Sequence, residues 1–126
     1  SLALNPENIN LLNNYSYYLA LQKVNLERAK ELILKVIDKF PNNSTYMDTY
    51  GWVMFQIGDY EKAEQILFNA VIKDGENSGE ILEHYGDVLF KLDNKKKAIT
   101  FWKKAKATGE HSKELIQKIN ENKFIE

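Results

Sequence analysis

The sequence predicts an all-α fold built from antiparallel helix hairpins, and three observations lead to this prediction. Between the glycines and prolines lie stretches of 12–16 residues whose apolar side chains recur every three or four positions, which is the helical period. Breaks of only two to five residues separate these stretches, so consecutive helices must run antiparallel. The same pattern of residues also returns along the chain about every 35 positions.

Seven helices follow from this pattern, and residues typical of helix ends mark their limits. We expect Gly58 to end one helix in a left-handed conformation, Asp59 to cap the next, and Pro41 to stop the second helix. The other expected N-caps are Asn25, Asn43 or Ser44, Asn94 and Ser112. The expected helices span residues 7–22, 26–39, 44–56, 60–73, 79–91, 95–107 and 112–122.

An internal repeat sets the architecture. Three positions recur at spacings of 34 or 35: a tyrosine followed by a small residue, an alanine in the next helix, and a proline. The recurring residues are Tyr15-Ser16, Tyr50-Gly51 and Tyr85-Gly86; Ala29, Ala63 and Ala98; and Pro6 and Pro41. This pattern resembles the tetratricopeptide repeat family over residues 9–110. The resemblance implies a right-handed α-α solenoid of three repeats, at about 9–43, 44–78 and 79–110, within a single domain 1–126.

The glycines of the repeat sit inside expected helices, where glycine costs about 1 kcal/mol relative to alanine. Gly51 and Gly86 therefore need a structural reason, and close approach of the two helices of a hairpin supplies one. The small residues Ala63 and Ala98 on the facing helices favour this explanation. In the first repeat, Ser16 takes the place of the glycine.

Both ends of the chain carry repeat-like features. Residues 1–6 resemble the end of a preceding repeat, because Pro6 stands where Pro41 stands one repeat later, so we expect further repeats upstream. At the other end, Leu115, Ile116 and Ile119 form a narrow apolar stripe among polar residues, which is typical of a capping helix over residues 112–122.

Composition excludes several classes of function. With 17 Lys and Arg against 18 Asp and Glu, the net charge of −1 argues against a nucleic-acid binder, and no apolar run is long enough to insert into a membrane. There is no cysteine, and neither His84 nor His111 lies in a metal-binding motif. No nucleophile elbow or phosphate-binding loop occurs. We therefore expect no enzyme activity, no cofactor and no metal site.

In the tetratricopeptide repeat family the first helix of each repeat lines a concave groove that binds peptides. Carried over by pattern, the resemblance implies an aromatic strip and an acidic end in this groove. The expected partner-binding residues are Tyr17, Asp48, Trp52, Phe55, Glu83, Asp87 and Phe90. Aromatic residues dominate interface energetics, and carboxylates select a basic or amide-rich partner. The alternative is that the rings pack between neighbouring helices and that the carboxylates form a solvated face.

The expected function is a protein-interaction scaffold that binds a peptide or partner segment. A subset of the family holds a partner's C-terminal carboxylate in a basic clamp, but Glu80 and His84 stand where that clamp wants basic groups. Alternatives are a terminal capping segment of a longer solenoid and a self-association module forming homo-oligomers. The compartment is open; similar repeats resemble bacterial proteins, some of the cell envelope, which favours the envelope or periplasm over the cytoplasm.

Overall fold

The computed structural model describes residues 6–73 and 75–125, which form seven α-helices and one short 3-10 turn, η1. No strand occurs among these residues, so the all-α prediction is confirmed. The three helix pairs are α1 (Pro6–Gln22) with α2 (Leu26–Lys39), α3 (Ser44–Ile57) with α4 (Tyr60–Ile72), and α5 (Gly79–Lys91) with α6 (Lys95–Thr108). The remaining elements are η1 (Gly75–Asn77), which the sequence did not predict, and α7 (Leu115–Glu121).

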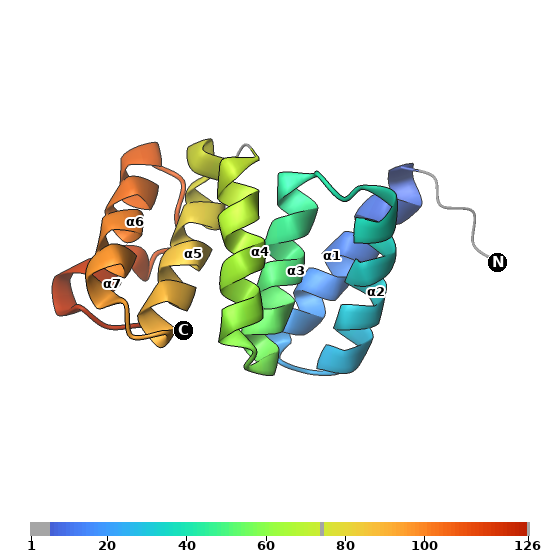
Figure 1. Cartoon of the computed structure of the whole chain (residues 1–126), viewed down its shortest axis with the longest axis horizontal. Helices are drawn as coiled ribbons and strands as arrows, with labels where there is room; N and C mark the ends of the chain where they lie inside the picture. Colours follow the sequence, from blue (N-terminus) through green and yellow to red (C-terminus); the bar gives the residue numbers. More distant parts are fainter. Residues whose placement is uncertain (1–5, 74, 126) are drawn as a thin grey trace.

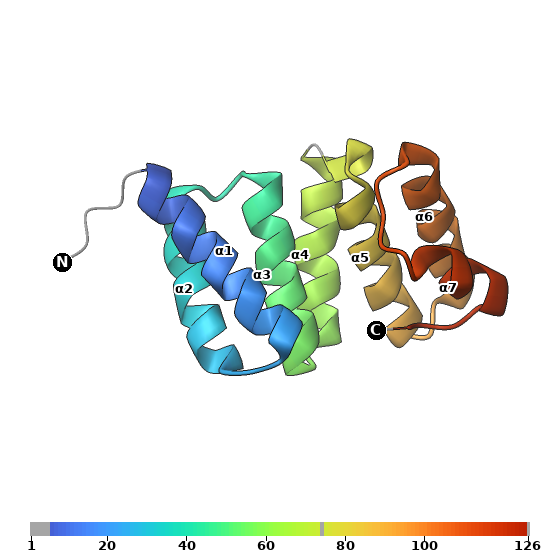
Figure 2. The same cartoon turned by 180° about the vertical axis from the view of Figure 1, so that it is seen from behind.

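The helices follow one another in a single row from α1 and α2 at one end to α6 and α7 at the other (Figures 1 and 2). The first helices of successive pairs contact each other, α1 with α3 and α3 with α5. The second helix of each pair also packs against the first helix of the next pair. The result is a solenoid of helix hairpins. None of the helices in the described part of the chain is long and apolar enough to cross a membrane.

Several helix ends have the expected chemistry. Gly58 adopts a left-handed conformation with φ 103°, and the Asp59 side chain accepts a hydrogen bond from the Lys62 backbone N–H at 3.2 Å. Asn43 caps α3 in the same way. Asn25 and Asn94 occupy the N-cap positions of α2 and α6 as expected, but neither side chain makes a cap hydrogen bond. A capping side chain needs an extended backbone, whereas Asn25 is left-handed with φ 47°.

The last helix is shorter than expected. It begins at Leu115 rather than at residue 112, and Ser112 does not cap it. The Ser112 backbone N–H and hydroxyl instead donate to the buried carboxylate of Glu83, which ties this residue to α5 ahead of the helix start. At the other end of the chain, the expectation for residues 1–6 lies outside the described residues except for Pro6, where α1 begins.

The helix glycines mark close contacts within two hairpins. A Cβ atom on Gly86 would lie 2.4 Å from Trp102 Cδ1 and 3.1 Å from the Ala98 carbonyl oxygen. A Cβ on Gly51 would lie 2.6 Å from Leu67 Cγ. The close approach is therefore confirmed, but the large residue one turn after each alanine fills the space opposite the glycine, not the alanine itself.

Candidate functional site

A cavity of about 530 Å³ opens on the face where α1, α3 and α5 lie side by side. The helices supply one wall of the cavity, and the segment that contains α7 supplies the other. The helix wall consists of Tyr17, Leu21, Trp52, Gln56, Glu80, Glu83, His84 and Asp87. The C-terminal wall consists of Glu110, His111, Ser112, Glu114, Lys118, Phe124 and Ile125. The cavity is thus bounded on both sides by elements that are distant in the sequence.

Helical periodicity places these side chains on one face. Asp48, Trp52 and Phe55 follow one another at spacings of four and three on α3, so they share one side of the helix. Glu80, Glu83 and Asp87 do the same on α5, again at spacings of three and four. The inter-helix contacts of α3 with α5 then bring the two rows together.

A buried pair links α3 to α5. The Nδ1 atom of His84 lies 2.9 Å from Oδ1 of Asp48, and both side chains are nearly inaccessible. The Trp52 ring stacks on the His84 ring with centroids 4.0 Å apart. The Phe55 ring in turn stacks on the Trp52 ring with centroids 4.5 Å apart. Burial by itself lowers the pKa of His84, but the adjacent Asp48 carboxylate outweighs it and raises this pKa to about 9. His84 is therefore a cation at neutral pH.

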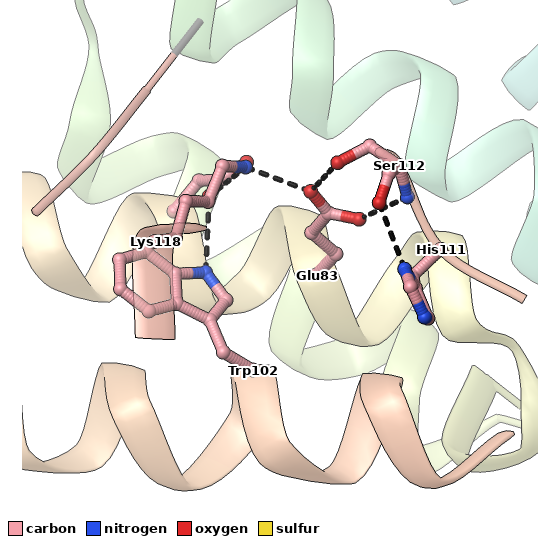
Figure 3. A network of polar contacts seen from close by, with 6 residues as sticks. Glu83, Trp102, His111, Ser112 and Lys118 are labelled. Atoms are coloured by element: carbon pink, nitrogen blue, oxygen red, sulfur yellow. Dashed lines mark hydrogen bonds and ion pairs between the residues drawn. The ribbon is translucent and has the colours of Figure 1, made fainter. Parts of the chain in front are cut away.

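A second buried cluster joins α5 to the C-terminal segment. The Lys118 ammonium lies 2.8 Å from Glu83 Oε2 and 2.8 Å from Asp87 Oδ1. Figure 3 shows Glu83 between Lys118 and Ser112, whose backbone N–H donates to Glu83 Oε1 at 2.8 Å. The indole N–H of Trp102 also donates to Asp87, at 3.0 Å. The carboxylates of Glu83 and Asp87 thus both accept hydrogen bonds from donors of the chain itself.

The titration behaviour of this second cluster follows from its geometry. Burial alone raises the pKa of Glu83, but the Lys118 ammonium and the Ser112 donors bring it below its usual value. For Asp87, complete burial dominates and raises the pKa to about 6 although Lys118 opposes the change. Burial lowers the pKa of Lys118, yet the two carboxylates together raise it above the usual range.

Glu80 behaves differently from the other carboxylates of the cavity. Glu80 is exposed, and among the described residues no lysine or arginine forms an ion pair with it. Partial burial of its carboxyl group and repulsion by Asp48 raise the pKa of Glu80, although His84 opposes this. Burial, together with the carboxylates of Glu80 and Asp48, raises the pKa of the Tyr17 hydroxyl far above its usual value. Negative charge is thus crowded around Tyr17 and Glu80.

The structure distributes the seven residues expected from sequence over three settings. Tyr17, Trp52, Glu83 and Asp87 line the cavity, whereas Asp48 is buried beneath it. Phe55 is buried against Trp52 and Phe124. Phe90 is half-buried on Trp102, with ring centroids 5.5 Å apart.

Eleven of the fifteen lining residues were not among the expected site residues, and these eleven include four that make contacts described above. Glu80 and His84 are on the expected groove helix but were not selected, whereas Lys118 and Phe124 come from the C-terminal segment. A signal for Lys118 exists in the sequence. It follows the buried Leu115 by three positions, which places it on the inward face of α7.

The donor atoms of Asp48, Glu80 and His84 all lie within 4.8 Å of one another. Among the described residues these three side chains are therefore the ones that could hold a metal ion. The hydrogen-bonded ion pair between Asp48 and His84 accounts for two of them without an ion. We assign no metal to this position.

Comparison with known proteins connects this geometry to a family. No protein-family model matches the chain. A TPR repeat-containing protein of Pseudomonas aeruginosa is 30% identical over 86 residues, or 68% of this chain, which spans only 14% of that relative's length.

Solved structures share the fold at low sequence identity. The Sgt2 TPR domain from Aspergillus fumigatus is 18% identical and superposes with a TM-score of 0.81, over 97% of this chain and 80% of that one. The first TPR of Spaghetti (RPAP3), bound to the HSP90 peptide SRMEEVD, is 14% identical with a TM-score of 0.80, over 97% and 95% of the two chains. The second TPR domain of human RPAP3, in complex with the HSP70 peptide SGPTIEEVD, is 16% identical with a TM-score of 0.75, over 96% and 100%. Together with the repeat in the sequence, these findings show that the chain belongs to the tetratricopeptide repeat family.

Proposed function

We propose that this chain is a protein-interaction scaffold whose groove receives a basic or amide-rich segment of a partner protein. The observation that carries the proposal is the cavity between the first helices and the C-terminal segment, with its excess of carboxylates. Of the proposed partner-binding residues, Tyr17, Trp52, Glu83 and Asp87 line this cavity, and Glu80 is added from the geometry. Asp48, Phe55 and Phe90 are proposed to support the surface from behind, since they are buried or packed against other rings.

Membership of the family supports the general function. Tetratricopeptide repeat proteins are protein-interaction modules and not enzymes, and two of the similar structures hold peptides. Those peptides, SRMEEVD and SGPTIEEVD, end in acidic residues. The groove of this chain carries an excess of carboxylates, which repel acidic peptides of this kind. We therefore expect a partner of a different charge class.

The charge balance of the groove supports a basic partner. The first helices α3 and α5 contribute four carboxylates, from Asp48, Glu80, Glu83 and Asp87. Two cationic groups, from His84 and Lys118, contact them. These six groups together carry a charge of −2 when all are ionised, and Glu110 and Glu114 of the C-terminal wall add to it. Such a surface favours approach of a cationic segment and repels an anionic one.

The test uses pools of labelled 12-residue peptides of three kinds: lysine- and arginine-rich, amide-rich, and acidic. Fluorescence anisotropy should detect binding of the basic or amide-rich pool and none of the acidic pool. Gln56→Arg places a cation in the cavity wall and should weaken this binding about tenfold, because it repels the ligand. Gln65→Arg, on the exposed side of α4, is the matched control and should bind like the wild type.

Two outcomes would contradict the proposal. One is the absence of binding by any pool at protein concentrations up to about 1 mM, which is the weak limit of specific recognition. The other is equal binding by the wild type and by Gln56→Arg, since the ligand would then lie outside the groove.

A second candidate is that the chain is one segment of a longer solenoid or associates with copies of itself. The outer face of α1 exposes Leu11, Tyr15 and Tyr18 at 64%, 50% and 55%. Seventy positions later, the residues equivalent to Leu11 and Tyr15 are Ile81 and Tyr85, which are 4% and 0% exposed where α5 packs against α4. The α1 face is therefore shaped to receive another helix, either from a preceding repeat or from another copy.

Light scattering separates these two sources of a covering helix. Self-association predicts that the molar mass rises with protein concentration and that Leu11→Glu with Tyr18→Glu restores the monomer. A chain that stays monomeric at high concentration would leave the preceding repeat as the covering element and would contradict self-association through α1.

A further inference from the structure

The helix wall of the cavity holds one carboxylate without a lysine or arginine partner, whereas its neighbours on that wall are paired. Asp48 is paired with His84, and Lys118 bridges Glu83 and Asp87 at 2.8 Å from each. Glu80 is the remaining carboxylate of the helix wall, and it stands next to the Asp48 side chain at the open surface. Within the described part of the chain, no lysine or arginine pairs with Glu80. Glu80 is therefore the carboxylate of the helix wall that no lysine or arginine neutralises, and Glu110 and Glu114 add negative charge on the opposite wall.

Aromatic rings surround the same position. The Tyr17 ring lies 6.2 Å from the His84 ring, and the Trp52 ring lies 4.0 Å from it. His84 is itself a cation and Trp52 is stacked against His84 and Phe55, so Tyr17 is the ring of the three that is available to a ligand beside Glu80. Aromatic faces attract cations within about 6 Å, and guanidinium groups in addition stack on them. A carboxylate flanked by rings is therefore suited to an organic cation.

An independent feature indicates that the ligand also carries hydrogen-bond acceptors. Trp52 is 6% exposed and lines the cavity, yet its indole N–H is a buried donor without an acceptor among the described residues. Buried donors in folded proteins nearly always have an acceptor. A peptide supplies backbone carbonyl groups as well as a side chain, whereas a metal ion supplies none.

We infer that the cavity is a binding site for the guanidinium group of an arginine side chain in a partner peptide. Glu80 pairs with the guanidinium, the Tyr17 ring flanks it, and the carbonyl groups of the peptide face the Trp52 edge. Arginine is favoured over lysine because its planar group pairs with carboxylates and stacks on rings at the same time. The volume of about 530 Å³ lies within the range of sites that enclose small ligands. This inference rests on the proposed function and names the residue that the groove selects.

The test compares three nonapeptides, Ac-GSGXAXGSG-NH2, in which X is arginine, its neutral isostere citrulline, or glutamate. Binding is followed by the NMR shift of the Trp52 indole N–H, which is assigned with Trp52→Phe because Trp102 is the other tryptophan. The arginine peptide should bind at least tenfold more tightly than the citrulline peptide, and the glutamate peptide should not bind. Charge-assisted hydrogen bonds account for a difference of this size.

Glu80→Gln is the decisive variant. It removes the charge but keeps the shape of an exposed side chain, and it should weaken the arginine peptide about tenfold while leaving the citrulline peptide unchanged. Glu61→Gln, on the exposed side of α4, makes the same charge change outside the cavity and should have no effect. Methylguanidinium serves as the free-cation probe and should bind much more weakly than the peptide.

The outcomes separate this inference from the proposed function. Equal affinities for arginine and citrulline peptides, or no effect of Glu80→Gln, would overturn the arginine site while the groove still binds peptides. Methylguanidinium binding as tight as the peptide would show that a free cation is the ligand, and binding lost in EDTA would show that a metal ion bridges the peptide; both overturn the inference. If none of the basic, amide-rich or acidic pools binds, the proposed function itself fails.

Discussion

Raising the pH from 6.5 to 9.5 should destabilise this domain through one residue, His84. The unfolded chain has a histidine pKa near 6.5, whereas the buried contact with Asp48 raises the pKa of His84 to about 9 in the folded protein. A group whose folded pKa is raised stabilises the fold fully below the unfolded pKa. This stabilisation is lost as the pH rises through the folded value.

The size of the effect follows from the two pKa values. A difference of one pKa unit corresponds to about 1.4 kcal/mol, so a change from 6.5 to about 9 corresponds to about 3 kcal/mol of unfolding free energy. The groups that face His84 are Asp48, Glu80, Asp87 and the Tyr17 ring. Asp87, with a pKa of about 6, titrates below this window, and Lys118 titrates above its usual pKa of 10.5. The His84 titration therefore accounts for most of the stability change expected between pH 6.5 and 9.5, and the variants below identify its share.

The measurement is urea unfolding followed by circular dichroism at four pH values between 6.5 and 9.5. The wild type should lose about 3 kcal/mol across this range. His84→Gln should lose less than about 1 kcal/mol, and Asp48→Asn should flatten the profile in the same way because the counter-charge is gone. His111→Gln, outside the pair, should keep the wild-type slope. A wild-type profile that is flat to within about 0.5 kcal/mol would show that His84 stays neutral, and the ion-pair reasoning would be refuted.

Three further predictions concern packing, the buried ion pairs and ligand charge. Gly86→Ala should destabilise the domain by about 2 kcal/mol in thermal unfolding, because its Cβ would meet the buried Trp102 ring, and Gly51→Ala against the Leu67 side chain should cost less. Lys118→Met should cost about 3–5 kcal/mol at pH 7 in urea unfolding, since it leaves two buried carboxylates unpaired. The exposed control Lys113→Met should change little, and equal losses in both variants would contradict this. The acidic peptide SRMEEVD should show no binding by calorimetry at protein concentrations up to about 100 μM, and micromolar affinity would contradict the charge argument.

Helical periodicity and end signals were sufficient to predict the first six helices. Their observed limits differ from the expected ones by no more than one residue. At the junction of α3 and α4, for example, Gly58 ends one helix and the adjacent Asp59 caps the next. The seventh helix was expected three residues too early. Ser112 has the chemistry of an N-cap, but its backbone N–H and hydroxyl donate to Glu83, a buried carboxylate distant in the sequence, and this contact holds Ser112 outside the helix. Local signals fail where a tertiary contact competes for the same group.

The candidate site was predictable in outline and not in detail. The repeat pattern placed Trp52 and Asp87 on the groove helices, where the structure has them. The pattern could not show that Asp87 is neutralised or that Phe124 covers part of the groove beside Phe55. Both facts depend on a C-terminal segment whose path across α5 has no counterpart in the repeats.

Three polar contacts join residues that lie about one repeat length apart in the sequence. Tyr46 donates to Asn10 at 2.7 Å, 36 positions earlier, and His84 contacts Asp48 at the same separation. Lys118 reaches Glu83 across 35 positions. These separations equal one repeat, because each first helix packs against the first helix before it in a fixed register.

The register gives α7 a defined place in the solenoid. Lys118 stands one repeat length after Glu83, as His84 stands about one after Asp48, so α7 provides the polar partner that a further first helix would provide. A step of about one repeat length therefore leads from Asp48 and from Glu83 to the group that neutralises each of them, whereas Asp87 shares Lys118 with Glu83. Applied to Glu80, a step of 35 leads to Leu115, which is fully buried and apolar. No cation thus stands one repeat length after Glu80, which agrees with its lack of a lysine or arginine partner among the described residues.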